Sequence, residues 1–415
     1  MHRLYADKKS VGGQAAPGRI SRYGLRFAPL ILAGVAALGP AALAAERPFN
    51  IPVILSLTGG GSFLGKQEHE ALAIEEKMVN QAGGIHGRPI HFVFRDDQSR
   101  PQIAVQLANE ALAGNPPVIL GSTLVAACNA MAPLMASGPV MYCFSAGIHP
   151  PKGGRVFTSG VSTHDQAAAM IRFFRFKGWK RLALITSTDA TGQDADRGFA
   201  ELLALPENYD IAFVERVHFN TADVSVSAQI ERIMAARPQA IIAWSTGSPI
   251  ATVFRGMVQA GLDLPVGTTG GNLTYSEMTQ FAGFLPKALY LPAPEWPIGE
   301  DPKVKLAPAV AAKQKEFFAA FAAAGVKPDE GSVLGWEPAN LIVDALRQLP
   351  PGATGAQLLD YLEHLSGAAG VNGFYDFVRS PQRGLSLDNV IVTRWNPGAA
   401  RWDVVAGPTG IPFGK

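Results

Sequence analysis

Short aliphatic segments alternate with amphipathic segments along most of this chain, and this alternation limits its fold more than any other feature. Residues 50–57 and 90–94 are rich in Val, Ile, Leu and Phe, whereas 68–82 between them carries apolar residues three and four apart. The first pattern is typical of strands buried on both faces, and the second of helices that cover such strands. The alternation predicts an α/β fold with doubly wound parallel sheets.

The alternating units form two series, and a chain of 415 residues is long enough for two lobes. The first series predicts the strands 50–57, 90–94, 118–120 and 140–144, joined by the helices 68–82, 103–113 and 127–136. The second series predicts four strands, each preceded by a helix. The strands are 182–187, 211–217, 240–244 and 265–268. The preceding helices are, in the same order, 165–177, one ending at 205, 225–237 and 250–260. In helix 225–237 the spacing places Val226, Ile230, Ile233 and Met234 on one face.

The last hundred residues follow a different pattern. Helices are predicted at 313–324, 338–349 and 354–365, the last with Thr354 and Gln357 as a possible capping box, and strands return only at 389–395 and 401–405. We expect these helices to pack on the first lobe and the final hairpin to join the second. The predicted domains are therefore 46–160 plus 292–385, and 161–291 plus 386–415.

The first 45 residues differ from the rest in charge. They hold six of the 36 Lys and Arg residues but one of the 34 acidic residues, followed by the apolar run Phe27–Leu38 and small residues around Ala44. These are the parts of a secretory signal peptide, and the run is too short to span a membrane. The remaining chain has a net charge of about −3, so nothing favours binding to nucleic acid.

Motifs for cofactors and catalysis are incomplete or absent in the sequence. The glycine-rich segment Gly59–Gln67 lacks the Ser or Thr of a phosphate-binding loop after Lys66, and it also lacks the third glycine of a dinucleotide site. His86 and His91 are separated by a turn and a strand, which disfavours a shared metal. Asp96–Asp97 is expected to cap the following turn. We expect no catalytic residues, no metal and no cofactor.

Cys128 and Cys143 are the two cysteines of the chain. One lies at the start of a predicted helix and the other near the end of the next strand, so both approach the carboxyl edge of the first sheet. In an oxidising compartment they can form a disulfide. Because the sequence does not fix their Cα separation, two buried free thiols are an equal alternative.

The segment Val79–Leu112 contains N-x-x-G-G-I-x-G-R-x-I at a helix end and a strand ending in Asp96–Asp97. In these residues, and in further segments that follow in order as far as Trp336–Leu346, the chain resembles the type I periplasmic solute-binding proteins of branched-chain amino-acid ABC transporters. The resemblance implies two Rossmann-like lobes joined by a three-strand hinge, which close over a small molecule. It also implies a monomeric periplasmic protein whose partner is an inner-membrane ABC permease.

The resemblance further implies a set of ligand-contacting residues. In the first lobe, helix-start N–H groups and a hydroxyl would hold a carboxylate, and Trp336 lies where the family supplies an aromatic wall. The full set is Phe63, Leu64, Val125, Ala126, Ser145, Ala146, Gly147, Thr191, Gly247, Asn272 and Trp336. Amino-acid-binding members carry an acidic residue where this chain has Gly270–Asn272, so the ammonium end of the site is predicted to be missing.

These observations predict the substrate-binding component of an importer. The expected solute is a carboxylate with an apolar or aromatic body, ahead of leucine or valine, because a buried ammonium group without an acidic partner is costly. A binding protein that reports to a signalling receptor is the first alternative. A Rossmann-type enzyme is a weaker one, since both glycine patterns are broken.

Overall fold

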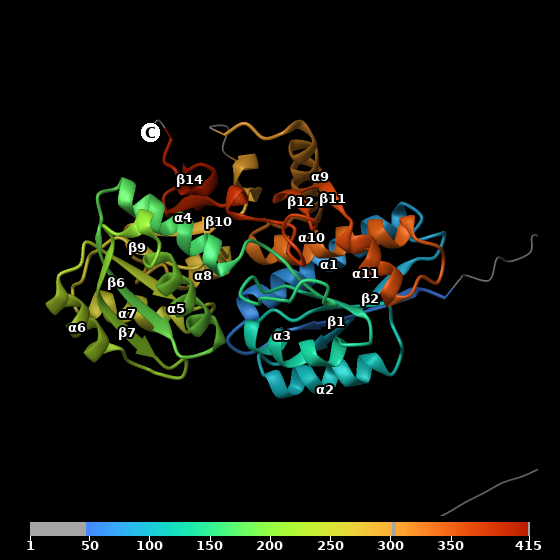
Figure 1. Ribbon diagram of the computed structural model, residues 1–415, viewed down its shortest axis with the longest axis horizontal. Helices are drawn as coiled ribbons and strands as arrows, with labels where there is room; N and C mark the ends of the chain where they lie inside the picture. Colours follow the sequence, from blue (N-terminus) through green and yellow to red (C-terminus); the bar gives the residue numbers. More distant parts are fainter. Residues whose placement is uncertain (1–46, 301–303, 414–415) are drawn as a thin grey trace, which may run out of the picture. The chain divides into compact units, whose positions relative to one another are not determined.

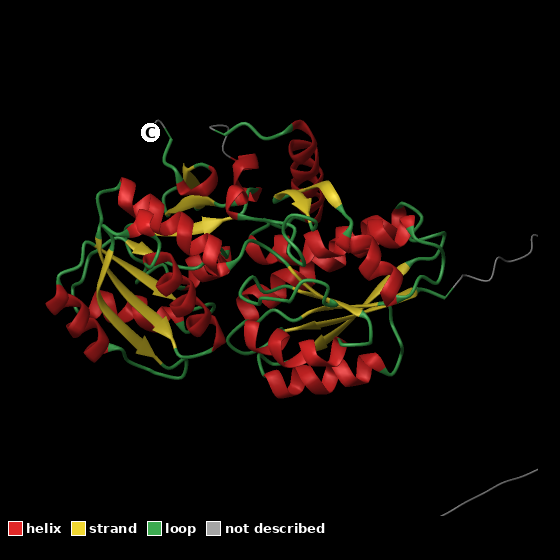
Figure 2. Ribbon diagram, in the orientation of Figure 1, coloured by secondary structure: helices red, strands yellow, loops and turns green. Residues whose placement is uncertain are grey.

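The computed structural model describes residues 47–300 and 304–413, which build two large β-sheets and one small one (Figures 1 and 2). The predicted signal peptide, residues 1–45, lies outside the described residues. In the described part of the chain, no helix is both long and apolar enough to cross a membrane.

The first sheet contains five parallel strands in the order β2-β1-β3-β4-β5. The strands are β1 (Phe49–Leu55), β2 (Ile90–Asp96), β3 (Val118–Gly121), β4 (Val140–Cys143) and β5 (Val156–Thr158). One face packs on α2 (Pro101–Leu112) and α3 (Val125–Met131), and the other on α1 (Ser62–Gln81), α10 (Glu330–Gln348) and α11 (Gly355–Glu363) (Figure 1). Burial on both faces explains why these strands are continuously apolar.

The second sheet has seven strands in the order β14-β13-β10-β9-β8-β6-β7, and β13 pairs antiparallel with both of its neighbours, β10 and β14, while the other pairs are parallel. The strands are β6 (Arg181–Ser187), β7 (Ala212–Phe219), β8 (Ala240–Trp244), β9 (Val266–Gly267), β10 (Leu289–Ala293), β13 (Ile391–Asn396) and β14 (Arg401–Ala406). One face packs on α4 (Thr163–Phe176) and α5 (Ala190–Leu203), and the other on α6 (Ser227–Ala236), α7 (Ile250–Gln259) and α8 (Tyr275–Gln280).

The remaining elements lie beside these sheets. Helix α9 (Pro308–Ala324) and the hairpin of β11 (Ser366–Gly370) and β12 (Gly373–Asp376) pack near α10. Short 3-10 turns occupy Ala132–Met135, Pro206–Asn208, Gly270–Asn272, Trp296–Glu300, Leu387–Asn389 and Pro408–Gly410. The predicted α/β class is confirmed, the tail helices α10 and α11 do pack on the first sheet, and the last hairpin does join the second.

Helix α10 begins eight residues before the predicted start at 338. Pro338 suggested a helix beginning, but it lies inside the helix, where a proline cannot donate to the carbonyl four residues earlier. The carbonyl of Leu334 instead accepts a hydrogen bond from the Ser159 hydroxyl at 3.2 Å. The true start is a capping box formed by Asp329 and Ser332. The early start brings Glu330 into regular structure.

Four strands were missed, and each has a weak sequence signal. β5 and β12 have only three and four residues, and β11 consists of serine, glycine and alanine. β10 contains Pro292, which is unusual in a central strand; its pairing with β9 uses Leu289 and Tyr290, so the proline lies beyond that ladder. Two smaller expectations were also wrong: α1 starts at Ser62 rather than at 68, and Met234 is 41% exposed on α6.

Candidate functional site

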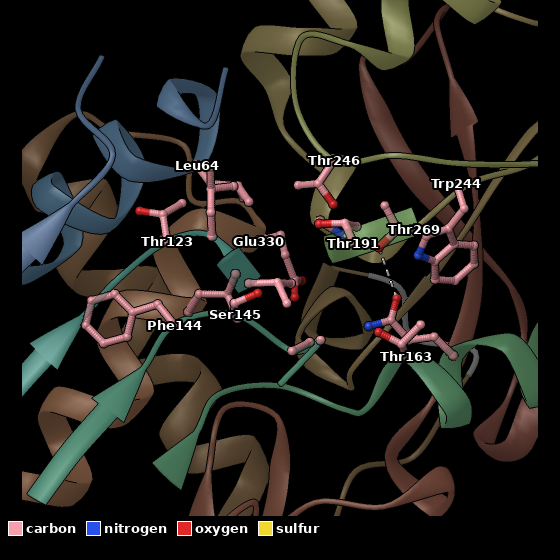
Figure 3. Close-up of a pocket in the computed structure, with 17 residues that line it drawn as sticks. Leu64, Thr123, Phe144, Ser145, Thr163, Thr191, Trp244, Thr246, Thr269 and Glu330 are labelled. Carbon is pink, nitrogen blue, oxygen red and sulfur yellow. Dashed lines mark hydrogen bonds between the residues drawn. The ribbon is translucent and has the colours of Figure 1, made fainter. Parts of the chain in front are cut away.

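Seventeen residues line a pocket that receives side chains from both large sheets and their helices (Figure 3). The lining residues are Leu64, Thr123, Leu124, Val125, Phe144, Ser145, Ala146, Gly147, Thr163, Gln166, Thr191, Trp244, Thr246, Thr269, Gly271, Glu330 and Leu334.

Most of this lining follows the carboxyl ends of parallel strands. Residues 123–125 come after β3 and 144–147 after β4, while Thr191, Thr246 and 269–271 follow β6, β8 and β9. The carboxyl ends of parallel strands share one edge of a sheet, where chain reversals leave room for a ligand. The fold therefore gathers loops that are distant in sequence around one space.

The walls of the pocket are largely apolar. Leu64 contributes from α1, Phe144 from the residue after β4, and Trp244 from the end of β8 (Figure 3). Val125, the first residue of α3, also lines the pocket. The Trp244 ring is held edge-on against Phe199, with centroids 5.3 Å apart. Such walls favour a solute with a hydrophobic body.

Hydroxyl and amide groups supply most of the polar lining, but several of them already form hydrogen bonds within the protein: the Thr269 hydroxyl accepts from the Gly271 N–H at 3.3 Å. Gln166 accepts from the Gly270 N–H at 3.0 Å and donates to the Val161 carbonyl at 3.1 Å. By contrast, no described residue forms a hydrogen bond with the hydroxyl of Ser145, Thr191 or Thr246. These three hydroxyls are available to a bound molecule.

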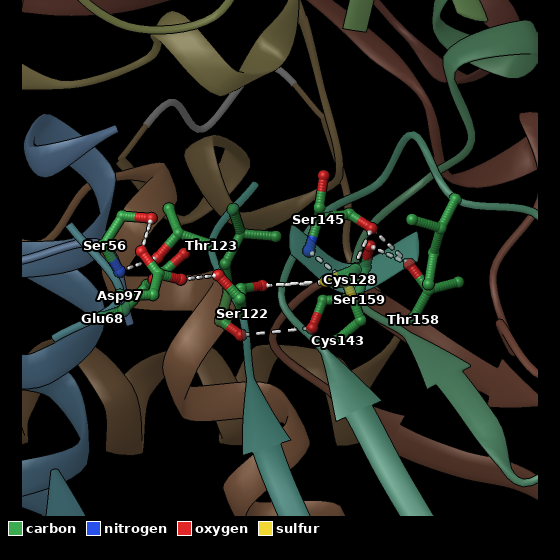
Figure 4. Close-up of a disulfide and its surroundings, with 12 residues drawn as sticks. Ser56, Glu68, Asp97, Ser122, Thr123, Cys128, Cys143, Ser145, Thr158 and Ser159 are labelled. Atoms are coloured by element: carbon green, nitrogen blue, oxygen red, sulfur yellow. Dashed lines mark hydrogen bonds between the residues drawn. A yellow bond between two sulfur atoms is a disulfide. The ribbon is translucent and has the colours of Figure 1, made fainter. Parts of the chain in front are cut away.

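A buried polar network supports the loop after β3 (Figure 4). The Thr123 hydroxyl donates to Glu68 at 2.5 Å and accepts from the Ser56 N–H at 3.1 Å. Asp97 accepts from the hydroxyls of Ser56 and Ser122. Burial raises the pKa of Glu68 well above its usual value, which suits a neutral acid among these partners. The predicted capping role of Asp96 and Asp97 is confirmed, since they accept from the N–H groups of residues 98 and 99 at 2.8 Å each.

Cys128 and Cys143 form a disulfide beside this network, with Cα atoms 6.0 Å apart (Figure 4). Both residues are fully buried. The Ser145 N–H lies 3.3 Å from the Cys143 sulfur. The bond thus joins the start of α3 to the end of β4, the two places from which Val125 and Ser145 enter the pocket.

One acidic side chain, Glu330, also lines the pocket. It is the first residue of α10, it is 5% exposed, and its Oε2 accepts a hydrogen bond from the Trp296 indole at 2.8 Å. Burial, with a contribution from Asp329, raises its pKa to about 8. None of the seventeen lining residues is Lys, Arg or His.

Six of the eleven residues singled out in the sequence line this pocket in the structure. They are Leu64, Val125, Ser145, Ala146, Gly147 and Thr191. Two others, Gly247 and Asn272, lie just behind it: Asn272 accepts from the Gly247 N–H at 3.0 Å and donates to the Ser245 carbonyl at 2.9 Å. Asn272 therefore holds together the loops after β8 and β9 and does not itself reach the pocket.

Phe63, Ala126 and Trp336 are outside the lining as well. Phe63 packs edge-on against Phe281 at 5.6 Å, and Ala126 is half-buried on α3. Trp336 is buried against Phe317 and Phe321 of α9, at 5.4 and 5.7 Å. Trp336 does not line this pocket, because its side of α10 faces α9, and Trp244 is the tryptophan among the lining residues.

The lining residues missed in the sequence were missed for different reasons. The loop residues among them carry no motif, and Trp244 was read as an ordinary strand residue. The segment before residue 338 was not read as helix, so Glu330 and Leu334 had no predicted position. The missed residues are Thr123, Leu124, Phe144, Thr163, Gln166, Trp244, Thr246, Thr269, Glu330 and Leu334, whereas Gly271 lies within the stretch Gly270–Asn272 that the resemblance indicated.

Comparison with protein families decides what kind of molecule this is. The family described as periplasmic binding protein matches residues 48–400. The chain belongs to this family. No curated protein matches it in sequence.

Solved structures of periplasmic binding proteins share its fold. An extracellular ligand-binding receptor from Rhodopseudomonas palustris HaA2 has 20% identity and a TM-score of 0.76, over 86% of this chain and all of the other. The leucine-binding protein LivK from Thermotoga maritima has 20% identity and a TM-score of 0.72, over 86% and 99% of the two chains. LivJ from Streptococcus pneumoniae, in complex with isoleucine, has 16% identity and a TM-score of 0.72, over 87% and 100%.

The resemblance noted in the sequence is thereby confirmed. Periplasmic binding proteins of this type are extracytoplasmic, bind small molecules, typically work with ABC permeases and are not enzymes.

Proposed function

We propose that this periplasmic binding protein is the substrate-binding component of an ABC importer, and that it captures a small hydrophobic solute bearing a carboxylate. The observation that carries the proposal is the pocket itself, which combines apolar walls with the unpaired hydroxyls of Ser145 and Thr191. An aromatic acid is the favoured solute, and a branched-chain or other hydrophobic amino acid is the second candidate.

The arrangement of the lining supports capture by closure. In this proposal the lobes are 46–160 plus 292–385, and 161–291 plus 386–415, and the chain passes between them three times. Val125 and Ser145 come from the first lobe, and Thr191 and Trp244 from the second. A solute that touches both lobes binds the closed form better than the open form, and this difference shifts the equilibrium toward closure. A permease can then distinguish the loaded protein by its shape.

Calorimetric titration tests the proposal. The exported protein is unfolded and refolded to remove any retained ligand, then titrated with benzoate, leucine, isoleucine and valine. We expect binding of benzoate and a smaller radius of gyration in solution scattering when it is bound. If none of the four ligands binds and the scattering profiles superimpose, the proposal is wrong.

Variants locate the binding in this pocket. Ser145→Ala and Thr191→Ala each remove one uncommitted hydroxyl, and each is expected to weaken benzoate binding by about tenfold, the value of one hydrogen bond to a charged group. Ser227→Ala, an exposed hydroxyl on α6, is the matched control and should bind like wild type. Equal affinities for all four proteins would place the ligand elsewhere.

A further inference from the structure

Glu330 is the one ionisable side chain among the residues that line the pocket. The two oxygens of its carboxyl group have different surroundings. Oε2 accepts from the indole of Trp296, which is fully buried and therefore fixes the carboxyl group. Within the described residues, no group is hydrogen-bonded to Oε1. Because Glu330 lines the pocket, Oε1 is the oxygen left for a bound molecule (Figure 3).

The surroundings of Glu330 disfavour a negative charge. No cationic side chain occurs among the lining residues, and the neighbouring carboxyl group of Asp329 is 1% exposed. Asp329 accepts backbone hydrogen bonds from Tyr275 and Ser332, and it in turn raises the pKa of the buried Glu68 and Glu277. A cluster of acids with little water and no counter-charge retains protons.

The direction of the pKa shifts agrees with this geometry. Burial raises the pKa of Asp329 to about 7 and that of Glu330 to about 8. At pH 7 the Glu330 side chain is then mainly a neutral carboxyl group. A neutral carboxyl group has one O–H donor, whereas a carboxylate has none.

We propose that Glu330 is a specificity-determining residue: it stays protonated, keeps Oε2 on the Trp296 indole and donates a hydrogen bond from Oε1 to the carboxylate of the solute. This inference rests on the proposed function. It gives an anion a fourth donor, beside the hydroxyls of Ser145, Thr191 and Thr246, in a pocket that has no cation. A solute with an ammonium group would require Glu330 to lose its proton.

Binding measurements with two probes test the inference. Benzoate and leucine are titrated into wild type, Glu330→Gln and Glu330→Ala at pH 6 to 9, in buffers of different ionisation enthalpy. Glutamine keeps both a donor and an acceptor, so Glu330→Gln should bind benzoate within about threefold of wild type and without pH dependence, whereas Glu330→Ala should lose tenfold or more. Wild-type affinity for benzoate should fall about tenfold between pH 7 and pH 9, with no proton released at pH 7.

The opposite pattern overturns the inference. Leucine binding that releases about one proton at pH 7, and that Glu330→Gln abolishes, would make Glu330 an ionised partner of an ammonium group. Glu295→Gln is the matched control: this half-buried carboxyl group also has a raised pKa, about 7, but it lies outside the lining, so its variant should keep the wild-type affinity and pH profile.

A ligand-free measurement separates failure of the inference from failure of the proposed function. The indole N–H resonance of Trp296, assigned by its loss in Trp296→Phe, should titrate with a midpoint near pH 8 in wild type and stay constant in Glu330→Gln. A midpoint below pH 6 overturns the inference even if no probe binds. Absence of binding by both probes, with the midpoint near pH 8, rejects the proposed function and with it the solute contact.

Discussion

At the scale of single residues, the positions behind the pocket matter as much as those that line it. Asn272 shows this: its amide joins the loops after β8 and β9, and a family resemblance had suggested ligand contact instead. The disulfide between Cys128 and Cys143 is a second support, because it joins the two chain segments that carry Val125 and Ser145.

Removing that disulfide should destabilise the protein. The bond closes a loop with a sequence separation of 15, which corresponds to about 3 kcal/mol by the loss of chain entropy in the unfolded state. The double variant Cys128→Ser/Cys143→Ser should therefore show a lower free energy of unfolding by up to this amount in urea titrations. Reductant should lower the stability of wild type and leave the double variant unchanged; an unaffected wild type would contradict the expectation.

At the scale of elements, the contact between α1 and α10 fixes the geometry of the site. Gly335 and Gly331 allow close approach: a Cβ at Gly335 would lie 2.9 Å from the Glu68 carbonyl oxygen, and one at Gly331 would lie 2.7 Å from the Gln67 Cβ. Because α1 carries Leu64 and α10 carries Glu330, this packing sets the distance between two parts of the lining.

Alanine at Gly335 or Gly331 should destabilise the protein. Alanine is the better helix former by about 1 kcal/mol, but the added methyl groups meet backbone atoms of α1, and overpacking typically costs 1–3 kcal/mol. We expect a net loss of about 1 kcal/mol or more for each variant in urea titrations. Gly283→Ala, where no atom lies within 4 Å of the new Cβ, is the control and should stay within about 0.5 kcal/mol of wild type.

At the scale of the whole molecule, buried acids dominate the electrostatics. Burial raises the pKa values of Glu68, Glu75 and Glu277 well above the usual range, and neither carboxyl oxygen of Glu277 or Glu75 has a hydrogen-bond partner among the described residues. The folded protein therefore holds protons that the unfolded chain releases above about pH 4.5.

Stability should consequently fall as the pH rises. An acid with a raised pKa in the folded state favours unfolding once the pH exceeds its unfolded pKa, so the free energy of unfolding should be highest near pH 5 and decrease toward pH 8. The pKa of Asp194 is lowered, mainly by its hydrogen bond with His149, so its protonation reduces the stability of the folded protein only below about pH 4. Urea titrations at pH 5, 6, 7 and 8 measure this slope.

Glu277→Gln should reduce the decrease of the free energy of unfolding with pH by up to about 1.4 kcal/mol per pH unit, which corresponds to one proton. The reason is that its buried carboxyl group no longer needs a proton to remain in the folded protein. Glu231→Gln, an exposed position on α6, is the control and should keep the wild-type slope. A free energy of unfolding that rises steadily from pH 5 to pH 8 would contradict the assignment of neutral buried acids.

The sequence by itself determined the fold class, because alternating buried strands and amphipathic helices leave few ways to hide their apolar surface. It also indicated the order of most elements, and the resemblance to a known family indicated six of the residues that line the pocket. Only the tertiary structure decided that Trp244 rather than Trp336 lines the pocket and that Glu330 enters it. Which face a residue presents, and whether an acid there keeps its proton, depends on neighbours that are far away along the chain.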